Sequence, residues 1–259
     1  MIPEAFILEW RQKLPWPENY QVEQDLIIER ALVDIFSHDK LASNLAFRGG
    51  TALHKLFLAP QVRYSEDIDL VQIVAGPIKD TIAAVQDQLN YLGKSTTQQT
   101  ENSNKIFYRI DSEIPPIIRL RLKIEINTRE HFSVFETRQI PWKVKSSWFR
   151  GETKIVTFSL EELLATKLRA LYQRRKGRDL FDLSYAYSMT KVDTPKLLKA
   201  YDIYMGENKP SKKQFLKNLN EKLENQEFLN DMNSLLHPDI GYDVNEAMDL
   251  IIKEIINNM

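Results

Sequence analysis

The stretch "FRGGTALHKLFLAPQVRYSEDIDL", residues 47–70, contains the signals that decide the fold of the chain. Its glycine pair, Gly49 and Gly50, follows a short apolar segment and frees the backbone for a tight turn. The apolar spacing after the pair predicts a short helix over residues 51–58. Residues 66–74 then alternate before they become mostly apolar, as a central strand does. This succession of turn, helix and strand is typical of an α/β domain.

Further helices and strands are predicted on both sides of this stretch. The clearest strand is "IRLRLKIEIN", in which isoleucine and leucine occupy one face and polar residues occupy the other. Residues 93–104, "GKSTTQQTENSN", contain no apolar residue and are predicted to form an exposed loop. The predicted helices cover residues 20–36 and 77–92, and the predicted strands cover residues 105–110, 118–127 and 153–158.

The second half of the chain has an almost entirely helical pattern. It begins at "SLEEL", where Ser159 and Glu162 fit the capping box that starts a helix. We therefore predict an α/β (α+β) protein, with a mixed sheet flanked by helices and a mainly helical C-terminal part. The predicted domains are residues 1–150 and 151–259, joined without a flexible linker.

The composition is that of a soluble globular protein, with 43% hydrophobic and 27% charged residues. A net charge of −1 indicates neither an acidic nor a basic partner. The absence of cysteine excludes disulfides, thiolate zinc sites and cysteine nucleophiles. No apolar run is long enough to span a bilayer, and the first residues lack the pattern of a signal peptide. We therefore expect a cytoplasmic protein without a membrane partner.

Asp67 and Asp69 are the first candidates for a functional site. They lie two residues apart on a predicted strand, so both carboxylates point to the same side. Like charges this close raise each other's pKa unless a cation lies between them, and a divalent metal ion meets that need. Glu125, on the polar face of a later strand, is the candidate third carboxylate. The three acids would suit two Mg²⁺ ions in a phosphoryl displacement.

The alternative for such an acid pair is a solvated strand edge, and the residues before the pair favour a site. A glycine turn that opens a helix offers backbone N–H groups and a positive dipole end to a triphosphate. Gly49, Gly50 and Thr51 are therefore candidate nucleotide-binding residues, and the Ser65 hydroxyl would add a contact to the same phosphates. The turn, the hydroxyl and the acids together favour a site for a nucleoside triphosphate (NTP).

A single lysine interrupts the apolar stripe of the first C-terminal helix. Lys167 lies three or four residues from Leu163, Leu164 and Leu171, which are predicted to face the core. An unpaired ammonium there is costly, so the side chain must either extend to solvent or meet a fixed negative partner. Of these alternatives we favour contact with a nucleotide phosphate.

A basic run follows this helix. It suits either a solvated helix end or a wall against nucleotide phosphates or an RNA backbone, and its first and last arginines are candidate nucleotide-binding residues. Asp179 and Asp182 would pair with these cations, and one of them would orient Lys167, but the spacing does not decide which. The basic run consists of Arg174, Arg175, Lys176 and Arg178.

With both stretches in view, the chain resembles the AbiEii family of nucleotidyltransferase toxins. These are the toxin halves of bacterial toxin–antitoxin and phage abortive-infection systems, and they are related to the DNA polymerase β superfamily. The resemblance rests on "FRGGTALHKLF…RYSEDIDL" and on "LLATKLRALYQRRKGRDLFDL". The interval from Gly50 to Asp67 is longer than the superfamily's usual spacing. The resemblance implies a nucleotidyltransferase-like sheet with a helical part that contributes to the active site.

The resemblance implies a role for each matched position. Ser65 and Asp67 become part of the catalytic motif, and Asp69 becomes the second metal carboxylate. Lys167 becomes the lysine that contacts the nucleotide phosphates. Asp182 becomes the distal acid of the Arg-Asp-x-x-Asp segment. Glu125, the third carboxylate, matches the family only by its place on a later strand.

The implied activity is transfer of a nucleoside monophosphate from an NTP to an acceptor hydroxyl, with two Mg²⁺ ions as cofactors. The implied acceptor is RNA, such as the 3′ end of tRNA, with a protein hydroxyl as its rival. The implied partner is a cognate antitoxin. Two alternatives stay open, namely an inactive member of the fold that binds RNA or protein, and a metal-dependent nuclease. The nuclease ranks lower because the four histidines are scattered along the sequence.

Overall fold

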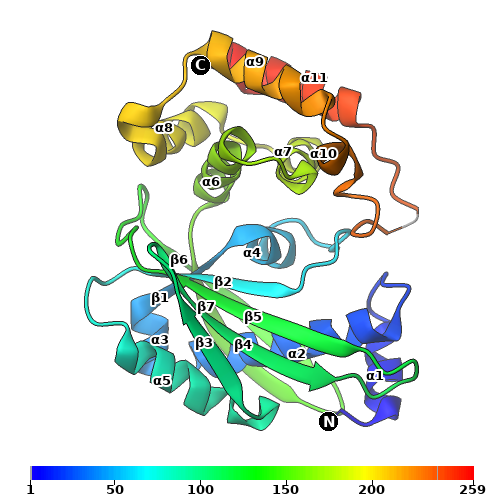
Figure 1. Ribbon diagram of the computed structural model, residues 1–259. Helices are drawn as coiled ribbons and strands as arrows, with labels where there is room; N and C mark the ends of the chain where they lie inside the picture. The colour runs from blue at the N-terminus through cyan, green and yellow to red at the C-terminus, as the bar shows by residue number, and fades with distance from the viewer. Residues whose placement is uncertain (1, 238) are drawn as a thin grey trace. The chain divides into compact units, whose positions relative to one another are not determined.

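The computed structural model describes residues 2–237 and 239–259, in which the chain forms two compact units (Figure 1). One unit contains a sheet with its helices, and the other is helical, so the predicted fold class is confirmed. In the described part of the chain, no helix has both the length and the apolar character that a membrane span requires. The first unit comprises the residues up to Leu56 and residues 64–158, and the second comprises residues 57–63 and 159–259.

A seven-stranded mixed sheet forms the centre of the first unit, in the order β3-β4-β5-β2-β1-β7-β6. The β2/β5 and β1/β7 pairs are parallel, and the other neighbours are antiparallel. The parallel β2/β5 pair brings the Asp-x-Asp strand beside the clearest predicted strand. The strands are β1 (Leu45–Arg48), β2 (Asp67–Gln72), β3 (Ser95–Gln99), β4 (Ser103–Asp111), β5 (Arg119–Asn127), β6 (Arg138–Lys145) and β7 (Arg150–Thr157).

The longest helix of this unit, α2, packs against β5, β6 and β7 (Figure 1). Helices α1, α3 and α5 pack against α2, whereas α4 directly follows β1 and packs against β1 and β2. The helix that begins at the glycine pair therefore lies against the Asp-x-Asp strand. The helices are α1 (Glu4–Arg11), α2 (Asn19–Phe36), α3 (Asp39–Asn44), α4 (Gly49–Leu56), α5 (Lys79–Gln88) and the 3₁₀ turn η1 (Asn90–Leu92).

Strand β5 has the two-faced pattern that its sequence predicts. Its leucines and isoleucines are buried, whereas its charged side chains are exposed or half-buried. In the parallel register with β2, Asp67 is opposite Lys123 and Asp69 is opposite Glu125. Residues in register share one face of a sheet, so the acids of β2 lie on the polar side of β5.

Helix α4 is anchored to α2 by a buried ionic cluster. The Lys55 ammonium lies 2.6 Å from Oδ1 of Asp25 and 2.7 Å from Oε1 of Glu29. The indole N–H groups of Trp10 and Trp142 donate to the remaining oxygens of the same two carboxylates, each at 3.0 Å. Buried charges are tolerated when they are paired and hydrogen-bonded, as they are here. The cluster holds the helix that follows the glycine turn against the body of the unit.

The second unit is built from helices that pack in pairs. Helix α6 packs against α7, α8 and α9, and α11 packs against α7. Ser159 caps α6 by accepting from the backbone N–H of Glu162, as the sequence indicates. The helices are α6 (Leu160–Gln173), α7 (Gly177–Met189), α8 (Thr194–Met205), η2 (Gly206–Asn208), α9 (Lys212–Leu223), α10 (Gln226–Asn230), α11 (Val244–Glu254) and η3 (Ile256–Asn258).

Two strands differ from the sequence-based prediction. The polar stretch 93–104, predicted to be an exposed loop, contains the edge strand β3 and the start of β4. An edge strand that is exposed along most of its length needs no apolar face, so periodicity gives no sign of it. Strand β6, at the opposite edge, is also mostly exposed, so periodicity gives no sign of it either. It contains Pro141, a residue that sheets accept at their edges.

The compact units divide the chain after residue 158, with one further segment. Strand β7 pairs with β1 and β6, so the first unit continues to Phe158. The segment 57–63 groups with the helical unit because Arg63 forms an isolated bridge with Leu236. The helical unit therefore includes a short segment from the first part of the chain, which a single cut in the sequence does not describe.

Candidate active site

The two carboxylates of β2 stand on the polar face of the sheet beside the start of α4. Asp67 and Asp69 are both half-buried, whereas Ile68 and Leu70 between and after them are buried in the core. Burial raises the pKa of the Asp69 carboxyl above its ordinary value, and the neighbouring Asp67 charge adds to that effect. A carboxylate that is costly to ionise in its surroundings is stabilised by a bound cation.

The glycine turn is shaped around Asp69. Gly49 has a φ of +80°, a conformation that suits glycine and strains other residues. A Cβ added to Gly49 would lie 3.0 Å from both Cβ and Cγ of Asp69 and closer still to its carboxylate. The turn therefore places the first backbone N–H groups of α4 next to the second acid of the pair.

The two hydroxyl candidates are brought together in the same unit. Oγ1 of Thr51 lies 2.5 Å from Oγ of Ser65, and it donates to the backbone carbonyl of Asp67 at 2.6 Å. Thr51 is buried and Ser65 is half-buried. The hydroxyl pair thus ties the first turn of α4 to the residues that lead into β2, and it sets Ser65 beside the acids.

A lysine that the sequence did not single out lies among the acids. The ammonium of Lys123 is 2.9 Å from Oδ2 of Asp67 and 3.0 Å from Oε2 of Glu125. Burial works against its charge, but the surrounding carboxylates, Asp67 and Asp69 first, raise its pKa above the ordinary value. Lys123 is thus a fixed cation between two carboxylates on neighbouring strands.

Glu125, the predicted third metal carboxylate, is held by donors of the protein. Its Oε1 accepts from the Ser103 hydroxyl at 2.7 Å and lies 3.5 Å from the Lys105 ammonium, while its Oε2 faces Lys123. Burial raises its pKa, but the hydrogen bonds from Ser103 and Lys123 outweigh burial and leave the pKa below its ordinary value. The donors around Glu125 therefore favour its ionised form.

The Asp67–Asp69 pair has the donor chemistry that Mg²⁺ prefers, since carboxylate oxygens are hard ligands. Their shared face and the raised pKa of Asp69 fit a cation at this position. In residues 2–237 and 239–259, no three His, Cys, Asp or Glu side chains are grouped so as to hold a metal ion. The pair fits a metal ion that completes its coordination with substrate oxygens and water.

The second unit contains an ionic cluster around Lys167. Its side chain is buried, and its ammonium lies 2.7 Å from Oδ2 of Asp182 and 3.3 Å from Oδ1 of Asp179. Arg63 and Arg174 complete what we call the Lys167 cluster. Arg63 donates to both oxygens of Asp182 at 2.8 and 3.2 Å, and Arg174 donates to both oxygens of Asp179 at 2.6 and 2.8 Å. The carboxylates of Asp179 and Asp182 thus each contact Lys167 and one arginine.

Two acids of the same unit therefore supply a fixed negative partner for Lys167, whereas the favoured phosphate contact stays a prediction. Sequence spacing left open which acid orients Lys167, and the structure places both in contact with it. Arg178, the other candidate for a nucleotide phosphate, is engaged elsewhere, because its guanidinium donates to both oxygens of Asp231 at 2.9 Å. Nucleotide contacts of Lys167, Arg174 and Arg178 stay predictions.

Two residues of these clusters escaped sequence reasoning. Lys123 occurs in a strand where charged residues alternate, so nothing in the sequence distinguishes it from its neighbours. Arg63 lies 119 residues from Asp182 and has no local pattern that connects the two. The remaining candidates fall into two groups: Gly49, Gly50, Thr51, Ser65, Asp67, Asp69 and Glu125 belong to the first unit, and Lys167, Arg174, Arg178 and Asp182 belong to the second.

Comparison with known proteins gives the family. A protein-family model described as "Nucleotidyl transferase AbiEii toxin, Type IV TA system" matches residues 30–249. No curated protein matches the chain. The matched range includes both units and both sequence stretches on which the resemblance rests.

Solved structures share the fold at low sequence identity. MenT4, a nucleotidyltransferase toxin from Mycobacterium tuberculosis, has a TM-score of 0.68 and 15% identity, over 100% of this chain and 91% of its own. JHP933 from Helicobacter pylori has a TM-score of 0.61 and 19% identity, over 93% of each chain. At this low identity, the two likenesses show that the fold is shared over nearly the whole chain.

Proposed function

The chain belongs to the AbiEii family of nucleotidyltransferase toxins, and on that premise we propose that it transfers a nucleoside monophosphate from an NTP to a hydroxyl of RNA. The acceptor that we propose is the 3′ end of tRNA. The observation that supports this most directly is the Asp67–Asp69 pair beside the Gly49 turn. Acids next to a helix start supply, in one place, metal ligands and donors for a triphosphate.

In the proposed reaction, the acceptor oxygen attacks the α-phosphorus of the NTP. The new O–P bond forms as the hydroxyl gives up its proton to solvent and as the bond to the β-phosphate oxygen breaks, and pyrophosphate leaves with that electron pair. Asp67 and Asp69 would hold Mg²⁺, which when bound supplies charge stabilisation to the phosphate oxygens. The backbone N–H groups of Gly50 and Thr51 and the Ser65 hydroxyl would bind phosphate oxygens and orient the chain of phosphates.

Lys123 and Glu125 hold the first acid in place. Lys123 bridges the two carboxylates, and Glu125 anchors Lys123 from the far side. A carboxyl with a lowered pKa is a weak base, so we assign Glu125 to alignment of the site and of the acceptor hydroxyl rather than to proton removal. Direct binding of a metal ion by Glu125 stays a prediction.

The Lys167 cluster would oppose the charge that develops on the phosphates. We assign Lys167 and Arg174 to contacts with the nucleotide phosphates, as the family resemblance implies, and the Arg174 side chain is 53% exposed. Asp182 and Asp179 act as positioning residues through Lys167. As a toxin of this family, the protein would be restrained by a cognate antitoxin and would act in the cytoplasm, with phage defence as one setting.

The test is an incubation of the purified protein with Mg²⁺, each labelled NTP in turn, and total RNA. Wild type should label RNA of tRNA size at its 3′ end, and Asp67→Asn should reduce labelling at least about a hundredfold, as loss of charge stabilisation does. Asp87→Asn, an exposed acid on α5, is the matched control and should label as wild type does. The proposal of an RNA acceptor fails if no NTP labels RNA. If the label appears on protein alone, the acceptor is a protein hydroxyl instead.

A further inference from the structure

The polar face of β4 and β5 extends away from the carboxylates and carries mainly cations. Arg121, Lys123 and Glu125 share one side of β5. Lys123 is in register with Asp67 of β2, and Glu125 is in register with Asp69. Across the antiparallel β4/β5 pair, Arg109 is directly opposite Arg121. Because cross-strand partners share a face, both arginines lie on the side of the sheet that bears the acids.

The Arg109–Arg121 pair lacks the compensation that other charges of this face have. Arg119 is 3.8 Å from Asp111, and Lys105 is 3.5 Å from Glu125. In the described part of the chain, no carboxylate forms an ion pair with either member of the Arg109–Arg121 pair, and both side chains are exposed. Like charges directly opposite one another destabilise a sheet, and a bound anion removes that cost.

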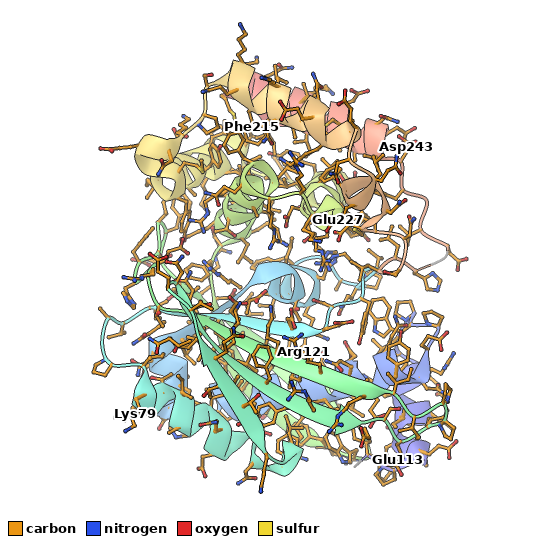
Figure 2. The ribbon with its side chains drawn as sticks, viewed as in Figure 1. Lys79, Glu113, Arg121, Phe215, Glu227 and Asp243 are labelled. Atoms are coloured by element: carbon orange, nitrogen blue, oxygen red, sulfur yellow. The ribbon has the colours of Figure 1, made fainter. Side chains whose placement is uncertain are left out.

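An aromatic ring lies under one of the two arginines. The guanidinium of Arg121 is 4.4 Å from the ring centroid of Phe107, which is 9% exposed. The cation–π contact holds the guanidinium of Arg121, which is labelled in Figure 2, over the ring. An arginine held over a ring offers a platform on which a nucleobase can stack.

The two arginines lie beyond the register of the acids on the same face. Arg121 precedes Lys123, which is opposite Asp67, by two residues, and it precedes Glu125, which is opposite Asp69, by four. These offsets correspond to about 7 and about 13 Å along a strand. A polynucleotide whose terminal hydroxyl is at the acids extends past this position with its next phosphates.

We propose that the exposed face of β4 and β5 around Arg109, Arg121 and Phe107 binds the single-stranded end of an RNA acceptor, a role that rests on the proposed function. The arginines contact backbone phosphates, and Arg121, held over the Phe107 ring, supports a base. Contacts of this kind are tolerant of sequence, so the surface orients the strand toward the acids and leaves the choice of RNA to other residues.

The experiment measures binding of a fluorescein-labelled single-stranded RNA by anisotropy, without nucleotide or metal, over a range of salt concentrations. Arg109→Gln combined with Arg121→Gln should weaken binding about tenfold or more. Loss of two phosphate contacts should also lower the slope of log K against log salt by about 1.4. Arg121→Lys keeps the charge but loses the planar stack, so it should give an intermediate affinity.

The matched control is Lys79→Gln combined with Lys94→Gln, which removes the same charge from exposed positions outside β4 and β5. Lys79 is labelled in Figure 2. The control should bind as wild type does, and the arginine double variant should melt at or above the wild-type temperature because a repulsive pair is gone. Equal RNA affinity of wild type and the double variant overturns the inference, as does an equal loss in the control. Loss of antitoxin binding with RNA binding intact also overturns it and makes the face a protein interface.

These results separate the inference from the proposed function. If wild type transfers nucleotide to RNA but the double variant binds and transfers equally well, the surface is wrong and the activity stands. If no transfer is found but RNA binding depends on Arg109 and Arg121, the activity is wrong and the surface stands.

Discussion

The side chain of Asp69 packs directly against the backbone of Gly49, because a Cβ on Gly49 would lie 3.0 Å from both Cβ and Cγ of Asp69. The glycine that opens α4 and the second acid of β2 are 20 positions apart in the sequence. They meet because β1 and β2 are antiparallel neighbours, with Arg48 in register with Asp69. The position of the catalytic carboxylate that we propose therefore depends on the absence of a side chain at the turn.

The first prediction concerns that turn. Gly49→Ala should cost about 1–2 kcal/mol of folding stability, because alanine is strained at a φ of +80°. It should also abolish most nucleotide transfer by displacing Asp69. Gly76→Ala is the control, since a Cβ there meets no atom within 4 Å. Thermal melting and the RNA labelling assay measure the two effects, and wild-type activity in Gly49→Ala would contradict the role of the turn.

The second prediction separates metal binding from folding at Asp69. Since burial raises the pKa of Asp69, ionisation costs stability, and stability should fall as pH rises from the ordinary carboxyl range through the raised pKa. Asp69→Asn should lose this decline and be at least as stable as wild type at neutral pH without metal.

Added Mg²⁺ with an NTP should raise the melting temperature of wild type but not of Asp69→Asn, because only a ligand that binds the folded state stabilises it. Calorimetry over a pH series measures both effects. A similar melting shift in the two proteins would place the metal elsewhere.

The third prediction concerns the Lys167 cluster. Asp182→Asn removes the buried carboxylate that Arg63 and Lys167 share, and it should destabilise the fold by about 3–5 kcal/mol. Asp87→Asn, which is exposed, should change stability by less than about 0.5 kcal/mol. Urea denaturation measures both variants. A small effect of Asp182→Asn would show that the cluster contributes little to the folded state.

The fourth prediction concerns Lys222, a buried lysine of α9. Burial, with the nearby Arg175 charge, lowers the pKa of Lys222 to about 8. Between that value and the ordinary lysine pKa, the unfolded chain keeps a proton that the folded chain has lost, so stability rises with pH.

Between pH 8 and pH 10, the unfolding free energy of wild type should therefore rise relative to that of Lys222→Met by about 1–3 kcal/mol. This magnitude follows from the energy of a pKa shift. The exposed Lys213→Met on the same helix should keep a constant difference from wild type. Parallel pH profiles for wild type and Lys222→Met would refute the assignment.

Local patterns of the sequence determined much of this protein. The alternation in β5, the cap of α6 by Ser159 and the Asp-x-Asp pair on β2 all follow from backbone periodicity, which a few neighbouring residues express. The same patterns carried the family resemblance, which the family model confirms. They failed at β3, where an exposed edge strand buries too little for any periodicity to arise.

The tertiary structure alone decided which charges meet. Lys123 lies between Asp67 and Glu125 because β2 and β5 pair in one particular parallel register. Arg63 pairs with Asp182 because the short segment 57–63 packs with the helical unit. Strand register and segment packing depend on contacts distant in sequence, so no local period encodes them. The sequence determined the elements and their chemistry, while packing decided the partners of each charge.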